Sequence, residues 1–109
     1  MGVMPAILLT LAIVTEVGAT IALRYSDGFT KAVPSAIVVA GYAFSFWMLA
    51  LVLRDLSIGL TYAVWSAAGT ALIAALGIFL FDEPATALKL ASLGLIIMGV
   101  VGLNFAGSH

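Results

Sequence analysis

Residues 56–81 read LSIGLTYAVWSAAGTALIAALGIFLF, a stretch without a charged side chain. About 20 apolar residues in a helix are enough to cross the hydrocarbon core of a bilayer. The strands of a membrane barrel are roughly half as long and alternate in polarity, which this stretch does not. It therefore predicts a membrane-spanning helix.

The whole chain has the same character. Its 109 residues are 64% hydrophobic and 8% charged, whereas soluble domains carry about 25% charged residues. So short a chain cannot hide that much apolar surface from water, so lipid must be its main solvent. The net charge of −1 gives no indication of a nucleic-acid partner.

Catalytic and metal-binding side chains are scarce. The chain has no Cys, and its one His is the last residue, His109. We therefore expect no metal site, no cofactor and no enzymatic nucleophile–base pair.

Charged residues mark the ends of three more apolar stretches. We predict an all-α membrane protein with a single domain, residues 1–109, built as one αα-hairpin followed by another. The four transmembrane helices are expected near residues 4–23, 34–53, 58–80 and 87–106.

Glu16 is the most informative residue, because it is the one charged side chain well inside a span. An ionisable group at this depth costs at least a few kcal/mol, and Glu cannot snorkel as far as Lys or Arg. Desolvation favours its protonated form. Glu16 is therefore a candidate proton carrier or a partner for a bound cation. The structural alternative is a partly protonated Glu that is hydrogen-bonded between helices.

Small and medium side chains share the helix face of Glu16 at three- and four-residue spacings. They would allow close helix packing or leave room for a ligand, and both interpretations stay open. These residues are Leu9, Ala12, Ile13, Ala19, Thr20 and Leu23.

Two aromatic pairs lie within the spans. Tyr62 and Trp65 share a face of the third helix, and Tyr42 and Phe46, with Ser45 beside them, share a face of the second. Aromatic rings often flank a bound cation, and each such contact contributes about 0.5–2 kcal/mol. An interfacial aromatic belt is the alternative interpretation.

Ser92, Gly99 and Ala106 repeat every seven residues in the last span. Such a row allows another helix to approach closely, either within the chain or from a second subunit. Four helices are too few to enclose a hydrated site, so we expect a homo-oligomer, most simply a homodimer with two Glu16 side chains facing one cavity.

The orientation signal is weak. The loops after the first and third spans carry Arg24, Lys31 and Lys89, and the opposite side carries Arg54. So small a bias is compatible with insertion in both directions.

With these residues the chain resembles the small multidrug resistance family nearly from end to end. The most specific parts are the membrane Glu16 and the Tyr62-Ala63-Val64-Trp65 stretch. The other matching segments are Val17, Thr20, residues 23–30 (LRYSDGFT), Pro34-Ser35, Ser45-Phe46-Trp47, residues 59–66 (GLTYAVWS), Gly69, Gly99 and Leu103-Asn104.

The resemblance implies an integral protein of the prokaryotic plasma (inner) membrane that works as a dimer, often with its two copies inserted antiparallel (dual topology). It implies that protons and lipophilic cations bind Glu16 in turn, so that proton entry drives cation export. Tyr42, Tyr62 and Trp65 fall at positions that contact substrate in such proteins, and the fourth helix, with Ser92 and Gly99, would carry the dimer seam. The implied partners are cationic small molecules, protons and membrane lipid.

Within the family, the chain resembles the multidrug branch, which exports quaternary ammonium and aromatic cations. Guanidinium exporters typically have Trp at the position of Ala19, lack Tyr42, and have Thr where this chain has Ser66. The chain departs from the multidrug pattern where Gly is usual, with Ala19, Ala67 and Ser92, and in its acidic loop, Asp82-Glu83-Pro84.

Two other functions remain open. A guanidinium exporter would need a dense polar network near Glu16, for which Thr20, Ser45 and Ser66 are the available hydroxyls. The chain could also be a non-transporting subunit of a paired heteromeric membrane complex.

Overall fold

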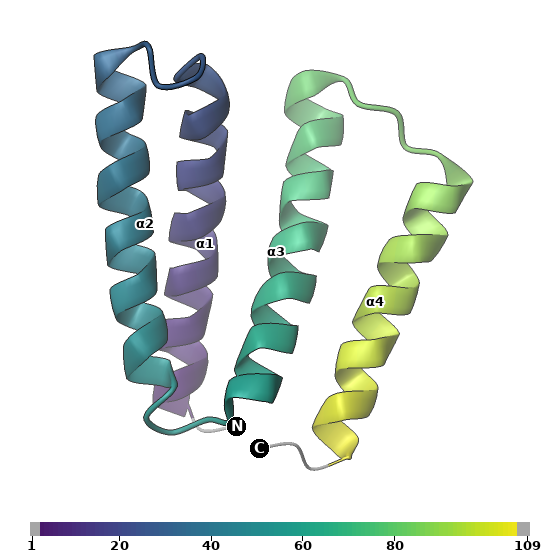
Figure 1. The fold of residues 1–109 in the computed structure, drawn as a ribbon. Coiled ribbons are helices and arrows are strands. Elements are labelled where there is room, and N and C mark those ends of the chain that lie inside the picture. Colours follow the sequence, from purple (N-terminus) through teal and green to yellow (C-terminus); the bar gives the residue numbers. More distant parts are fainter. Residues whose placement is uncertain (1–2, 107–109) are drawn as a thin grey trace. The chain divides into compact units, whose positions relative to one another are not determined.

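The computed structural model describes residues 3–106, and within them four α-helices follow one another (Figure 1). All four are long and apolar enough to cross a membrane, so the expectation of four apolar helices is confirmed. Their bounds are α1 Val3–Tyr25, α2 Ala32–Val52, α3 Ile58–Phe81 and α4 Ala87–Phe105.

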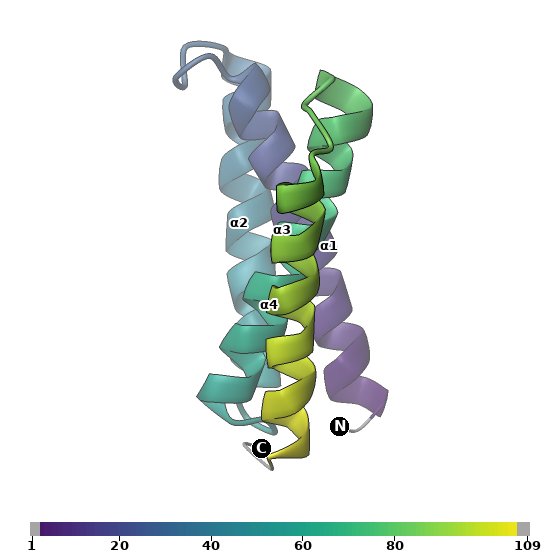
Figure 2. The same ribbon diagram turned by 90° about the vertical axis from the view of Figure 1, so that its right-hand side faces the viewer.

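The chain divides into two compact units at Asp55 and Leu56. The first hairpin is α1 with α2 and the second hairpin is α3 with α4, and in both views the helices of each hairpin run antiparallel (Figure 1, Figure 2). Each hairpin is described by itself below. The single domain expected from the sequence stays a prediction.

The two helices of the first hairpin approach each other closely at Gly41. A Cβ atom built on Gly41 would lie 2.8 Å from the Cβ atom of Ala19, which is closer than real side chains come. The approach therefore depends on the absence of a side chain at residue 41. Buried residues extend along both helices from here: Leu9, Ala12, Ile13, Val17 and Ala19 on α1, and Val38, Ser45, Met48 and Val52 on α2.

Ser26 organises the turn between α1 and α2. Its hydroxyl donates to the Leu23 carbonyl oxygen at 2.7 Å and accepts from the Phe29 N–H at 3.1 Å. Its own carbonyl accepts from the N–H groups of Thr30 and Lys31. Ser26 is buried. Its hydrogen bonds stabilise the short loop that reverses the chain between the two helices.

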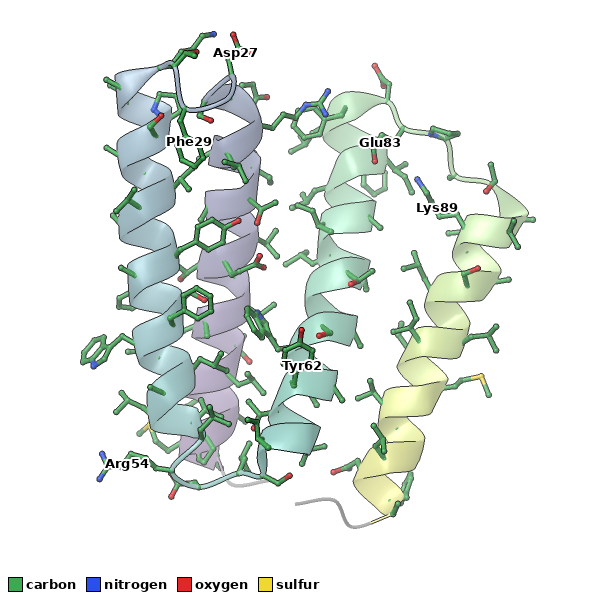
Figure 3. The ribbon with its side chains drawn as sticks, in the orientation of Figure 1. Asp27, Phe29, Arg54, Tyr62, Glu83 and Lys89 are labelled. Atoms are coloured by element: carbon green, nitrogen blue, oxygen red, sulfur yellow. The ribbon has the colours of Figure 1, made fainter. Side chains whose placement is uncertain are left out.

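Three consecutive residues of this turn have left-handed backbone angles. The φ angles are 49° at Asp27, 70° at Gly28 and 66° at Phe29. Glycine adopts such angles freely, but a bulky side chain rarely does. The hydrogen bond from Phe29 to Ser26 therefore helps to hold a costly conformation in place. Figure 3 labels Asp27 and Phe29 in this turn.

Both helices of the second hairpin begin with a side-chain cap. The Ser57 hydroxyl accepts from the Leu60 N–H at 3.3 Å, and the Thr86 hydroxyl accepts from the Lys89 N–H at 3.1 Å. Such caps satisfy N–H groups that have no partner inside the helix. They fix where α3 and α4 start.

Helix α3 ends at a left-handed residue, Asp82, with φ 54°. The N–H groups of Asp82 and Glu83 both donate to the Gly77 carbonyl oxygen. The Glu83 carboxylate lies against Gly77, in the space that a side chain at residue 77 would occupy. Glu83 and Lys89 point toward one another across this turn (Figure 3).

Helix α4 packs loosely within its hairpin. None of its described residues is buried, whereas α3 has five buried residues. A cleft of about 280 Å³ lies between the two helices, lined by Val64, Ala67, Ala68, Ala71, Ile97, Val100 and Val101. Much of the apolar surface of α4 therefore faces away from its own hairpin.

Candidate functional site

Glu16 lies in the middle of α1 and is half-buried in the first hairpin. The Thr20 hydroxyl, one helical turn further along, donates to Glu16 Oε1 at 3.0 Å. The nearest Lys or Arg along α1 is Arg24, eight residues away, which is roughly 12 Å along the helix axis. The carboxylate is thus held by a neutral donor from its own helix.

Tyr42 extends this arrangement from α1 to α2. Its hydroxyl lies 2.7 Å from Thr20 Oγ1, with both groups half-buried. A threonine hydroxyl has one proton. When Thr20 donates it to Glu16, Tyr42 must be the donor to Thr20. The three groups then form one directed chain, from Tyr42 through Thr20 to Glu16.

The Ser45 hydroxyl is used within the hairpin. It donates to the Ala12 carbonyl oxygen at 2.7 Å, and the side chain is 1% exposed. Breaking the hydrogen bond of a buried hydroxyl costs free energy, because the group is left without a partner. Ser45 therefore ties α2 to α1 and is poorly available to a ligand.

The residues expected beside Glu16 separate into two groups. Leu9, Ala12, Ile13 and Ala19 are buried, which gives them a packing role in this structure. Thr20 and Leu23 are half-buried, as Glu16 is. A contact between any of these residues and a ligand stays a prediction.

The aromatic pairs have the geometry that their spacing predicts. The rings of Tyr42 and Phe46 are stacked, with centroids 6.4 Å apart. The rings of Tyr62 and Trp65 meet edge to face at 5.9 Å. Tyr62 is 64% exposed on α3 (Figure 3), and Ser66 is exposed on the same helix. Each hairpin thus has one aromatic pair of its own, and Glu16 lies in the first hairpin.

The expected seam residues lie open on α4. Ser92 and Gly99 are exposed, and a Cβ atom built on Gly99 meets nothing within 4 Å. Within the second hairpin, packing therefore does not explain a small residue at 99. Their contact with a second subunit stays a prediction.

Sequence reasoning did not find three features of these hairpins. The first is the close approach at Gly41, for which a small residue in an apolar helix is a weak signal. The second is the Thr20–Tyr42 hydrogen bond, which joins residues 22 apart. The third is the Thr61 hydroxyl, which is buried without a hydrogen-bond partner among the described residues. No local sequence pattern indicates the Thr20–Tyr42 hydrogen bond or the burial of the Thr61 hydroxyl.

Comparison with known proteins identifies the family. Residues 4–96 match the family model described as Small Multidrug Resistance protein. The chain belongs to this family, as its motifs predict, and it is an integral protein of the bacterial plasma membrane.

Relatives of known name cover nearly the whole chain. The quaternary ammonium compound-resistance protein QacE of Escherichia coli is 47% identical over 96 residues, which is 88% of this chain and 87% of QacE. The multidrug resistance protein EbrA of Bacillus subtilis is 44% identical over 91% of this chain and 94% of its own length. The multidrug resistance protein mmr of Mycolicibacterium paratuberculosis is 42% identical over 97% of this chain and its full length.

Proposed function

We propose that the protein is a proton-coupled antiporter that exports hydrophobic, aromatic or quaternary ammonium cations, with Glu16 as the shared site for proton and substrate. The observation that carries the proposal is the Glu16 carboxylate, placed mid-span and hydrogen-bonded by the neutral Thr20 hydroxyl. A charge so placed is costly in hydrocarbon unless a cation or a proton neutralises it. The name of QacE supports quaternary ammonium compounds as substrates, and the names of EbrA and mmr support a role in multidrug resistance.

The chemistry follows from this placement. Ionised Glu16 pairs with the charge of the substrate, and aromatic rings such as Tyr42 and Phe46 supply apolar and cation–π contact. Protonation removes the negative charge and releases the cation. Because proton and cation compete for one group, a proton gradient can drive cation export. Transport, rather than catalysis, is therefore the function.

A homodimer completes this proposal. The α4 helix, with no buried residue among those described, offers a long apolar surface, and Gly99 on it is open. Small residues on such a surface allow close helix packing in a membrane. Two copies joined through α4, inserted in opposite orientations, would provide two Glu16 side chains and access from both sides of the membrane.

Proton release on substrate binding tests the shared site. Adding tetraphenylphosphonium to detergent-purified protein in weak buffer should release protons from the wild type, because the cation displaces them from Glu16. The Glu16→Gln variant should release none. Glu83→Gln, which removes a carboxylate outside the spans, is the matched control and should behave as the wild type. Full proton release by Glu16→Gln would overturn the proposal.

A further inference from the structure

Two hydroxyls of the first hairpin donate their protons within the protein. Ser45 donates to the Ala12 carbonyl oxygen and is buried. Thr20 lies between Glu16 and Tyr42, at 3.0 Å from the carboxylate and 2.7 Å from the phenol oxygen. A guanidinium ion, whose N–H groups only donate, would have to compete with Thr20 for an acceptor position on Glu16 Oε1. A quaternary cation, which has no N–H group, would not.

The direction of these hydrogen bonds determines which donors Glu16 already has. Thr20 donates its one proton to Oε1, and Tyr42 donates to Thr20, so both hydroxyl protons are directed toward the carboxylate. Hydrogen bonds to an ionised acceptor are roughly twice as strong as neutral ones. The protein thus supplies one donor to Glu16 Oε1, at an acceptor position that a substrate N–H group could otherwise use.

We infer that Thr20 is a specificity-determining residue, which favours cations without hydrogen-bond donors by supplying the donor to Glu16 from within the protein. The inference rests on the proposed antiport function and adds to it the basis of selection among cations. Thr20 acts through Glu16 and does not need to touch the substrate. Tyr42 strengthens the effect, because its hydroxyl fixes the direction in which Thr20 donates.

A matched pair of ligands isolates the effect. Benzyltrimethylammonium and benzylguanidinium share one ring and one charge and differ in their N–H donors. The experiment measures the affinity of the purified full-length protein for each, in the wild type and in three variants. Thr20→Val keeps the shape and removes the hydroxyl, Thr20→Ser keeps the hydroxyl, and Tyr42→Phe removes only the outer donor.

The expected result is a change in the ratio of the two affinities. Thr20→Val should shift the ratio toward benzylguanidinium by about tenfold, which is typical for the loss of a hydrogen bond to a charged group. Thr20→Ser should restore the wild-type ratio. Tyr42→Phe should shift the ratio in the same direction by a smaller factor, because Thr20 still donates to Glu16.

Other outcomes would overturn the inference. If Thr20→Val changes both affinities by one factor, Thr20 has only a structural role. If Thr20→Ser fails to restore the ratio, the hydroxyl is not the cause. These failures leave the antiporter intact as long as the wild type releases protons through Glu16. If wild-type protein binds neither cation, the inference fails, and the proposed function fails with it only if tetraphenylphosphonium also releases no protons from the wild type.

Discussion

The two hairpins are similar in sequence character and differ in how they pack. In the first hairpin the helices approach at Gly41, and side-chain hydrogen bonds from Ser45 and Tyr42 join α2 to α1. In the second hairpin no described residue of α4 is buried, and a cleft of about 280 Å³ lies between the helices. The mean hydropathy of the spans is nearly the same, from 1.9 to 2.1.

This difference shows that hydropathy alone does not determine helix pairing in a membrane. Lipid tails are as apolar as the side chains, so close packing and interhelical hydrogen bonds decide which helices hold together. The first hairpin has both, and it also holds Glu16, the carboxylate that we propose as the shared site for proton and cation. The second hairpin leaves apolar surface on α4 that its own α3 does not cover.

The largest expected effect is at the close approach of the first hairpin. Gly41→Leu would force α1 and α2 apart, because even a Cβ atom at residue 41 would lie 2.8 Å from Ala19 Cβ. We expect the free energy of unfolding to fall by about 2–3 kcal/mol, which is typical of overpacking. Denaturation by sodium dodecyl sulfate in mixed micelles, followed by circular dichroism, measures it.

Gly18→Leu is the matched control for this prediction. Gly18 lies on α1 of the same hairpin, is exposed, and has nothing within 4 Å of a built Cβ atom. Its substitution should change stability by no more than about 0.5 kcal/mol. Equal losses for the two variants would show that the close approach at Gly41 does not hold the hairpin together.

The sequence was sufficient to predict the spans because their physics is simple. A backbone in lipid must satisfy its own hydrogen bonds, so each long uncharged run becomes a helix. Glu16 stands out as a candidate site residue for a related reason, since one carboxylate in an apolar run is costly. The charges at Arg54 and Asp55 marked the boundary between the hairpins.

The rotation of each helix about its axis could not be predicted in the same way. The spans are apolar on all sides, so no polar stripe indicates which face of α1 meets α2. The bond between Thr20 and Tyr42 depends on that rotation, as does the burial of Leu9 and Ile13. Sequence spacing placed these residues near Glu16 without showing which of them packs and which stays accessible.

The second prediction concerns the open surface of α4. Gly99→Leu should leave the fold of the chain unchanged, because the structure has open space there. If α4 carries the proposed dimer seam, self-association should weaken by about tenfold or more, since close helix packing needs small residues. Sedimentation equilibrium in detergent measures the association, and circular dichroism checks the fold.

Gly94→Leu serves as the control on the same helix. Gly94 also has nothing within 4 Å of a built Cβ atom, but it lies roughly 140° around the helix from Gly99. The self-association of the Gly94→Leu variant should stay close to that of the wild type. An unchanged association for Gly99→Leu would place the seam elsewhere. A wild-type protein that is monomeric and inactive alone would favour a subunit of a heteromeric complex.

The smallest expected effect is at the turns, where the two hairpins also differ. In the first turn, the hydrogen bonds of Ser26 stabilise the left-handed residues. In the second turn, Asp82 ends α3 with φ 54°. Its Cβ atom makes this backbone conformation unfavourable. Asp82→Gly should raise the free energy of unfolding by about 0.5–1 kcal/mol, because glycine adopts this angle without strain.

Asp82→Ala removes the same charge and keeps the Cβ atom, so it should not be stabilising. Asp55→Gly, at a residue without a positive φ angle, should be neutral or slightly destabilising. Equal stabilisation by Asp82→Gly and Asp82→Ala in the same micelle titration would assign the effect to charge near the helix end, and not to the backbone.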